Sequence, residues 1–211
     1  MRKSLKVCAT ALMLAGALML GSCSLWYHSL EYNKTTNIYT DKRNGVTYTD
    51  APFRYEAVKM GKKYGKQTGQ GGETVFYTIE GMDPAEWLTE EWGTVFYATS
   101  MPLPTLAEME PVEVLICIEE TSTFVVAEIT GSDDIAELIS EWENGEALEY
   151  PAVNPTLSRR VKFVSEKYPG IYYSLIYLEY SDGGKYLYSR DDGRFVEVGS
   201  LISDALEGKS S

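Results

Sequence analysis

Apolar and polar side chains alternate in several short stretches of this chain, and such alternation is typical of a β-strand that buries one face. In residues 73–80 the side chains of Val75, Tyr77 and Ile79 fall on one face of the predicted strand. Further strands, rich in β-branched and aromatic residues, are predicted at 93–99, 112–119, 123–130 and 159–165. The pattern predicts several strands of antiparallel sheet.

A hairpin is predicted at Asn44-Gly45, which separates the stretches 38–40 and 46–48. Both turn residues tolerate the positive φ that a type I′ turn requires. Downstream, residues 53–66 combine five basic side chains with two glycines. We expect irregular strands there, with lysines that protect an exposed sheet edge.

Three stretches have the spacing or the capping residues of short helices. Asp83 is followed by Pro84 and, three residues on, by Glu86, which is the pattern of a capping box with proline at the first helical position. Apolar residues recur at helical spacing over 132–144. Ser200 is a candidate cap for a last helix.

These elements predict the α+β fold class, with mainly antiparallel sheet and two or three short helices. The predicted domain covers residues 45–208, as one unit or as two lobes that divide near 101–111, where prolines make a stiff connector. Residues 23–44 are expected to contain a lipid anchor, a tether and the first hairpin strand. The reason for expecting an anchor lies in the first residues.

Three basic residues within the first six precede an uncharged stretch, 7–20, which is too short for a membrane-spanning helix of about 20 apolar residues. The stretch ends in Leu20-Gly21-Ser22-Cys23. This order resembles the lipobox of bacterial lipoproteins, which has an aliphatic residue, two small residues and an obligatory cysteine. Residues 1–22 are therefore predicted to be a lipoprotein signal peptide.

The resemblance implies that the Cys23 thiol receives a diacylglyceryl group, with acyl chains such as palmitate, and that a peptidase cuts between Ser22 and Cys23. Two acyl chains hold a protein stably on a membrane, whereas one binds only marginally. We expect a lipid-anchored protein of the cell envelope, at the extracytoplasmic face of the membrane. The alternatives are an uncleaved anchor, or a signal cut without lipid in which Cys23 is an incidental thiol.

The net charge and the number of cysteines limit which partners and which disulfides we expect. Without residues 1–22, 189 of the 211 residues remain, and three of the 19 Lys and Arg are lost against 31 Asp and Glu, so the formal charge is −15. Binding to nucleic acid is not expected, because its affinity comes largely from neutralising phosphates. Cys117 would be the one cysteine outside the signal and the anchor, so no internal disulfide is expected.

The sequence offers little for catalysis. The single histidine, His28, lies five residues after Cys23 and before the expected domain, so a nucleophile would have no histidine to accept its proton. Zinc sites of His and Cys are excluded by count. Cys117, between two isoleucines, is expected to be a small buried hydrophobe. No cofactor and no metal are predicted.

Paired carboxylates remain as candidates for hydrolysis, since glycoside cleavage needs two acids about 5–10 Å apart. Adjacent acids occur at Glu90-Glu91, Glu119-Glu120, Asp133-Asp134 and Asp191-Asp192. Each pair lies at a predicted turn or helix cap, where solvated or capping roles are expected, and no spacing singles out one pair. The interpretation is therefore a protein that is not an enzyme.

The C-terminal part is the most aromatic. Its strands 171–180, 185–189 and 194–198 are separated by turns that contain Asp-Gly, which predicts an antiparallel meander. A possible binding face consists of Tyr173, Tyr177, Tyr186 and Tyr188. The alternative, cross-strand packing of residues with high β-propensity, is favoured.

The leading prediction is a membrane-anchored lipoprotein with a non-enzymatic domain that binds a protein or an envelope component. One alternative is an envelope glycan hydrolase that uses two carboxylates, and another is a regulator that acts through its sheet edge. In its Tyr and Glu content the mature part resembles small uncharacterised lipoproteins of Gram-positive bacteria. That resemblance assigns no functional residue.

Overall fold

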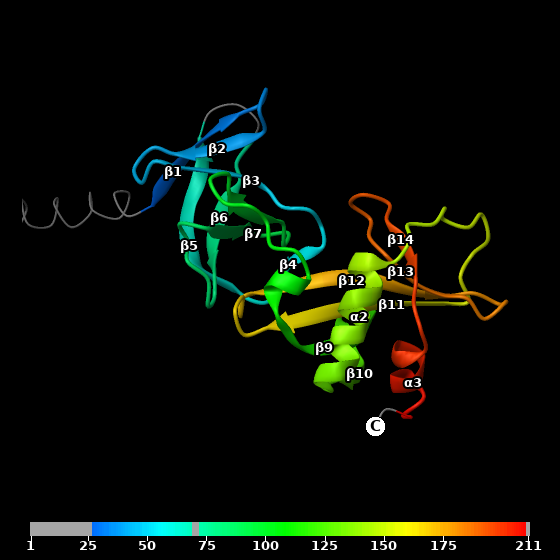
Figure 1. Cartoon of the computed structure of the whole chain (residues 1–211). Coiled ribbons are helices and arrows are strands. Elements are labelled where there is room, and N and C mark those ends of the chain that lie inside the picture. The colour runs from blue at the N-terminus through cyan, green and yellow to red at the C-terminus, as the bar shows by residue number, and fades with distance from the viewer. Residues whose placement is uncertain (1–26, 69–71, 210–211) are drawn as a thin grey trace, which may run out of the picture.

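The computed structural model describes residues 27–68 and 72–209. Seven strands of the N-terminal half close into a barrel in the order β1-β2-β3-β8-β7-β6-β5, coloured blue to green in Figure 1. Their bounds are β1 His28–Asn33, β2 Ile38–Asp41, β3 Val46–Asp50, β5 Met60–Thr68, β6 Val75–Ile79, β7 Trp87–Glu90 and β8 Val95–Ala98. Neighbours are antiparallel except at the closure, where β1 runs parallel to β5.

The barrel interior is packed with large side chains, among which Leu30, Tyr48 and Phe76 have no exposed surface. At the closure, Gly65 of β5 approaches the backbone of His28 so closely that a Cβ would collide with the His28 carbonyl oxygen. Glycine at this position therefore permits the parallel pairing of β1 with β5.

A buried carboxylate also stabilises the closure. Asp41, at the end of β2, is fully buried, and its Oδ2 lies 2.6 Å from both His28 Nδ1 and Tyr64 Oη. Its Oδ1 accepts the backbone N–H groups of Arg43 at 2.9 Å and Asn44 at 3.3 Å. Burial alone would raise the pKa of Asp41, but the hydrogen bonds from Tyr64, His28 and the Arg43 backbone outweigh it and hold the pKa below its ordinary value.

The second half forms an antiparallel sheet in the order β10-β9-β11-β12-β13-β14, and a further short strand, β4, pairs with β12. Strand bounds are β4 Tyr55–Ala57, β9 Pro111–Glu119, β10 Thr123–Ile129, β11 Leu157–Ser165, β12 Ile171–Glu179, β13 Lys185–Tyr188 and β14 Phe195–Glu197. Because β4 lies between β3 and β5 in sequence, the chain leaves the barrel, adds a strand to the sheet and returns. The barrel and the second sheet, which we call the two bodies, are therefore interlocked.

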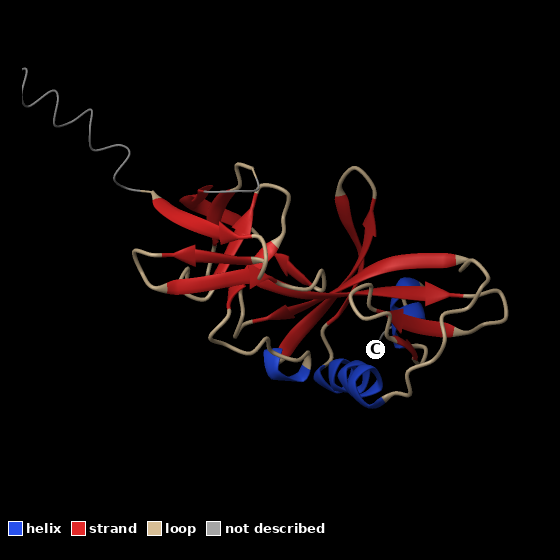
Figure 2. Cartoon of the chain, turned by 90° about the horizontal axis from the view of Figure 1, so that it is seen from above, coloured by secondary structure: helices blue, strands red, loops and turns tan. Residues whose placement is uncertain are grey.

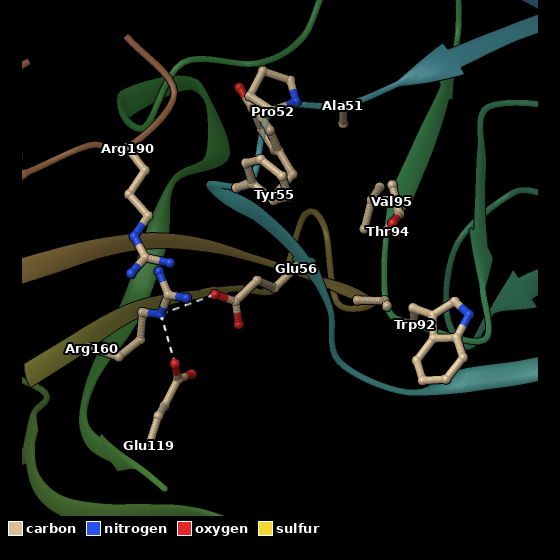
Figure 3. Close-up of a pocket in the computed structure, with 13 residues that line it drawn as sticks. Ala51, Pro52, Tyr55, Glu56, Trp92, Thr94, Val95, Glu119, Arg160 and Arg190 are labelled. Carbon is tan, nitrogen blue, oxygen red and sulfur yellow. Dashed lines mark hydrogen bonds and ion pairs between the residues drawn. The ribbon is translucent and has the colours of Figure 1, made fainter. Parts of the chain in front are cut away.

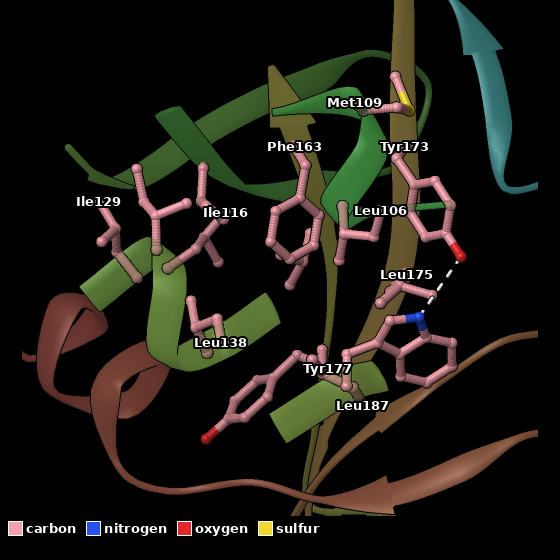
Figure 4. Packing of buried hydrophobic residues seen from close by; sticks show 14 of the residues in the cluster. Leu106, Met109, Ile116, Ile129, Leu138, Phe163, Tyr173, Leu175, Tyr177 and Leu187 are labelled. Carbon is pink, nitrogen blue, oxygen red and sulfur yellow. Dashed lines mark hydrogen bonds between the residues drawn. The ribbon is translucent and has the colours of Figure 1, made fainter. Parts of the chain in front are cut away.

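Helices α2 (Ser132–Asn144) and α3 (Leu201–Leu206) pack on one face of this sheet (Figure 2), and a single 3-10 turn, η1, spans Ala107–Met109. Figure 4 shows Leu138 of α2 among Ile116 and Tyr177 of the sheet, all of them buried. Arg194 ends α2 by donating to the carbonyl oxygens of Trp142, Glu143 and Gly145 at 2.8–3.2 Å. Among the described helices, none is long and apolar enough to cross a membrane.

The large core of the sheet extends into the barrel through Trp87 of β7. Trp87 has no exposed surface, and its ring centroid lies 6.2 Å from that of Tyr55 in β4 and 6.3 Å from that of Tyr168 in the β11–β12 turn. The neighbouring Leu88 packs in the separate core of the barrel interior. Strand β7 is thus buried on both faces.

The predicted α+β class is wrong, because the chain is mostly β. Strands make up 45% and helices 12% of it, a seven-stranded barrel is closed, and one helix of the described part exceeds two turns. The predicted helix after Asp83 is a single turn, with Trp87 N–H bonded to the Asp83 carbonyl at 2.9 Å, and the chain then enters β7. Burial of β7 on both faces removed the alternation that would have marked it as a strand.

Two local predictions need correction and several are confirmed. Residues 28–33, expected in the tether, form β1. The hairpin of β2 and β3 is present, but Gly45 alone of the two turn residues has positive φ, at 71°. The predicted strands near 73–80, 93–99, 112–119, 123–130 and 159–165, the helix over 132–144 and the C-terminal meander are all confirmed.

Candidate functional site

A pocket of about 310 Å³ lies where the barrel meets the second sheet, and an adjoining pocket of about 350 Å³ lies over β9, β11 and β12 of that sheet. We call them together the junction groove (Figure 3). Both are lined by Glu119, Arg160 and Arg190, and the first also by Phe53, Glu56 and Trp92.

Strand alternation places the charges of the groove. In β11, Val161 and Phe163 enter the large core, so Arg160 and Lys162 face the opposite side of the sheet. Glu56 comes from the inserted strand β4, where its neighbour Tyr55 enters the same core. The groove therefore lies on the face that the helices leave uncovered.

Four of these side chains form an alternating ion-pair quartet, consisting of Glu56, Glu119, Arg160 and Lys162. Lys162 Nζ lies 2.7 Å from Glu56 and 3.2 Å from Glu119, while Arg160 Nε lies 3.3 and 3.2 Å from the same two carboxylates. Burial would lower the pKa of Lys162, but the hydrogen bond and charge of Glu56, and then those of Glu119, raise it above its ordinary value. For Glu119, burial is likewise outweighed by Arg160 and Lys162, so its pKa is lowered.

The rim of the groove is aromatic and solvent-exposed. Trp92 is 89% exposed and Phe53 is 73% exposed. In Figure 3, Trp92 lies at the end of the pocket away from Arg190, whose guanidinium faces that of Arg160. Within the described part of the chain, Arg190 makes no hydrogen bond or ion pair. The groove thus combines an arginine end with an aromatic end.

Two of the acidic pairs predicted as catalytic candidates instead hold the loops of this rim. Glu90 is buried and accepts the backbone N–H groups of Trp92 at 2.9 Å and Thr94 at 3.0 Å. Asp191 accepts those of Phe53 at 2.6 Å and Arg54 at 3.0 Å. Both carboxylates therefore position an exposed aromatic residue.

The remaining acids of the four pairs are engaged or exposed. Asp192 pairs with Arg54 Nη1 at 2.7 Å. Burial would raise the pKa of Asp192, but the hydrogen bonds from Arg54, from the Arg194 backbone and from Ser189 together outweigh it and lower the pKa. Glu91, Glu120 and Asp133 are exposed, and Asp134 is half-buried in the first turn of α2. Across the described residues, no three His, Cys, Asp or Glu side chains are grouped to hold a metal ion.

The four tyrosines of the predicted binding face do not form one surface. Tyr173 and Tyr177 are buried in the large core beneath α2 (Figure 4). Tyr186 and Tyr188 are half-buried in a separate cluster with Phe195. The four tyrosines therefore pack within the sheet and its core, as the alternative to a binding face predicts.

Of the predictions for Cys117 and His28, the first is confirmed and the second is wrong. Cys117 is 1% exposed, as expected of a buried hydrophobe, and burial raises the pKa of its thiol. His28 is predicted to precede the domain, and this is wrong, because His28 lies in β1 of the barrel and bonds to Asp41. Leu20, Gly21, Ser22 and Cys23 lie outside the described residues.

No family model, curated protein or solved structure matches this chain. The groove itself is therefore the basis for any functional proposal. Its main residues were missed by the sequence analysis, although the Arg159-Arg160 pair and Lys162 in one strand were visible. Trp92 and Arg190 come from loops far apart in sequence, and no local pattern connects them.

Proposed function

We propose that this protein is an exported lipoprotein, held at the extracytoplasmic face of the membrane by acylated Cys23, that binds an envelope component at the junction groove without transforming it. The observation that carries the proposal is the exposure of Trp92 and Phe53 on the rim of a groove that also contains Arg190, whose side chain has no hydrogen-bond or ion-pair partner among the described residues. Tryptophan and arginine are the residues that contribute most to binding hot spots.

The construction of the rim supports binding over a purely structural role. An exposed tryptophan stabilises no core, yet here Glu90 is buried in order to hold its loop. Burying a carboxylate costs free energy unless its hydrogen bonds compensate. The chain thus uses a buried acid to present Trp92 to solvent, which favours a partner for that ring.

The anchor would hold the barrel close to the membrane. Tyr27, the first described residue, follows Cys23 by four positions, and four extended residues span at most about 14 Å. The start of β1 would therefore lie near the lipid headgroups. A ligand of the groove would then be found in the envelope just outside the membrane.

A second candidate function uses the sheet edge, as a regulator of another exported protein. Strand β10 pairs with β9 on one side, and three successive large apolar residues, Phe124, Val125 and Val126, are 44–58% exposed on it. An exposed apolar edge strand favours pairing with another strand. The glycan-hydrolase alternative stays a prediction, with clearing of a peptidoglycan zymogram as its measurement.

Changing Cys23 to serine is expected to abolish lipid labelling and to release or mislocalise the protein, because a serine hydroxyl cannot form the thioether to lipid. The measurement is fractionation of cells labelled with radioactive palmitate, with Cys117→Ser as the matched control that keeps the anchor. Full lipid labelling of the Cys23→Ser protein in the membrane fraction would overturn the anchor.

Binding at the groove is expected to give photo-crosslinks from its rim. Benzoylphenylalanine is placed at position 92, at position 126 on the β10 edge, or at exposed position 153 as control. We expect a saturable adduct with envelope material from position 92 and none from 153. An adduct from position 126 alone would favour the edge candidate, and equal yields from 92 and 153 would contradict specific binding.

A further inference from the structure

We propose that the junction groove is an oxyanion site, and that its ligand is an acidic saccharide of the envelope whose carboxylate or phosphate binds between Arg160 and Arg190 while a sugar ring packs on Trp92. This inference rests on the proposed function and names the ligand class of the same groove. It follows from how the two guanidinium groups are used.

The guanidinium of Arg160 uses one of its donor groups for the ion-pair quartet and leaves the others unused. Its Nε faces Glu56 at 3.3 Å and Glu119 at 3.2 Å, and its terminal Nη groups make no hydrogen bond within the described part of the chain. In Figure 3 one of those Nη groups points toward the guanidinium of Arg190. Two unpaired donor groups with like charge therefore face each other.

An oxyanion is the ligand that this geometry fits. Like charges repel, so the pair of guanidinium groups is unfavourable until an anion lies between them. The planar guanidinium matches carboxylate and phosphate oxygens with two parallel hydrogen bonds, and these charge-assisted bonds are about twice as strong as neutral ones. Each arginine can thus bind one edge of the same anion.

The surroundings favour an anion although the whole protein is acidic. Glu56, Glu119 and Glu120 line the groove together with Arg159, Arg160 and Arg190, and Lys162 completes the quartet. Cations therefore outnumber acids here, in a chain with 19 Lys and Arg against 31 Asp and Glu. The quartet also fixes the orientation of Arg160 before any ligand arrives, which lowers the entropic cost of binding.

The other end of the first pocket selects for a ring. Trp92 offers exposed aromatic surface there, and an aromatic ring packs well on the apolar face of a sugar. A pocket of about 310 Å³ is at the small end of the range for small-molecule sites. A disaccharide that carries one negative group can therefore reach from the arginine pair toward Trp92.

The test is calorimetric titration of the full chain, purified in detergent, at constant ionic strength. The probes are the disaccharide of N-acetylglucosamine and N-acetylmuramic acid, sucrose phosphate, their neutral counterparts diacetylchitobiose and sucrose, and inorganic phosphate. We expect the acidic disaccharides to bind at least about tenfold more tightly than the neutral ones. Preference for one of the two tells whether the source is a carboxylated or a phosphorylated glycan.

Three variants make the test specific to the groove. Arg190→Gln is expected to weaken the acidic disaccharides about tenfold, while Arg43→Gln, the same charge change in the exposed β2–β3 turn, leaves them unchanged. Trp92→Ala is expected to weaken the disaccharides and to leave inorganic phosphate unaffected. Both groove residues are exposed, so circular dichroism spectra should match the wild type.

Equal affinity of the Arg190→Gln and Arg43→Gln proteins for the acidic disaccharides would overturn the proposal. So would neutral disaccharides that bind as tightly as acidic ones, or no measurable binding of any anion. If crosslinks still form from position 92 in that case, the groove binds a ligand of another class and the proposed function stands. If acidic disaccharides bind but position 92 gives no crosslink in cells, the proposed function fails instead.

Discussion

Replacing Trp87 with alanine is expected to lower the free energy of unfolding by about 3–5 kcal/mol, the range for removing a buried tryptophan side chain. The loss is expected at the upper part of this range, because Trp87 has no exposed surface and contacts aromatic rings of both bodies, Tyr55 in β4 and Tyr97 in β8. The cavity would open where the barrel and the sheet meet, and an interlocked backbone can collapse little to fill it.

Urea unfolding followed by far-ultraviolet circular dichroism measures this loss without relying on tryptophan emission. Trp87→Phe is the first control. The indole Nε1 has no hydrogen-bond partner among the described residues, so phenylalanine removes a buried unpaired donor while keeping most of the ring, and a loss of about 1–2 kcal/mol is expected.

Trp92→Ala is the second control, since it deletes the same side chain where it is 89% exposed. A change within about 0.5 kcal/mol is expected there. A Trp87→Ala protein as stable as the Trp92→Ala protein would show that the junction contributes little to stability.

The junction also explains why the groove exists. Strand β4 adds Glu56 to the sheet, and the loop before it presents Phe53 against the β13–β14 turn that contains Asp191. Trp92 comes from the barrel and Arg190 from the sheet. A site composed of residues from both bodies requires that they keep one relative position, and the core around Trp87 supports that position.

Local patterns predicted the strands well because alternation records which face is buried. They failed at β7, where Trp87 packs in one core and Leu88 in the other, so no polar face remains. They also failed at β1, because His28, Glu31 and Asn33 are polar. The pairing that makes β1 a strand, its parallel contact with β5, joins segments more than thirty residues apart.

The candidate site was still less accessible to sequence analysis. Glu90 and Asp191 were noticed as members of acidic pairs, but their role in holding Trp92 and Phe53 depends on turn geometry. Arg190 has the sequence context of an ordinary turn residue. Its position opposite Arg160 results from the order of strands in the sheet, which no local motif encodes.

Replacing Asp41 with alanine is expected to destabilise the protein by about 3–5 kcal/mol, comparable with breaking a buried ion pair by removing one partner. Four donors lose their acceptor at once: His28 Nδ1, Tyr64 Oη and the backbone N–H groups of Arg43 and Asn44. Each buried donor left unpaired is itself unfavourable. The variant should therefore loosen the closure between β1 and β5.

Asp41→Asn and Asp50→Ala are the controls. Asparagine keeps the shape and one carbonyl oxygen for the turn, but its amide group meets the donors His28 and Tyr64, so an intermediate loss of about 2 kcal/mol is expected. Asp50 is exposed in β3, and its replacement should cost less than about 1 kcal/mol. Equal losses for Asp41→Ala and Asp50→Ala would contradict the proposed role of the buried carboxylate.

The contribution of Asp41 to the free energy of unfolding is also expected to decrease at acidic pH. The folded pKa of Asp41 lies below its unfolded value, which is about 3.9 for aspartate, so the ionised carboxylate stabilises the fold fully above that value. This contribution disappears as the pH falls through the lower folded pKa. The part of the difference in unfolding free energy between wild type and Asp41→Asn that comes from the ionised Asp41 should therefore shrink as the pH falls below about 4. Other carboxylates titrate in both proteins and cancel in the difference, so a difference that stayed constant into strong acid would show that Asp41 is not held ionised by His28 and Tyr64.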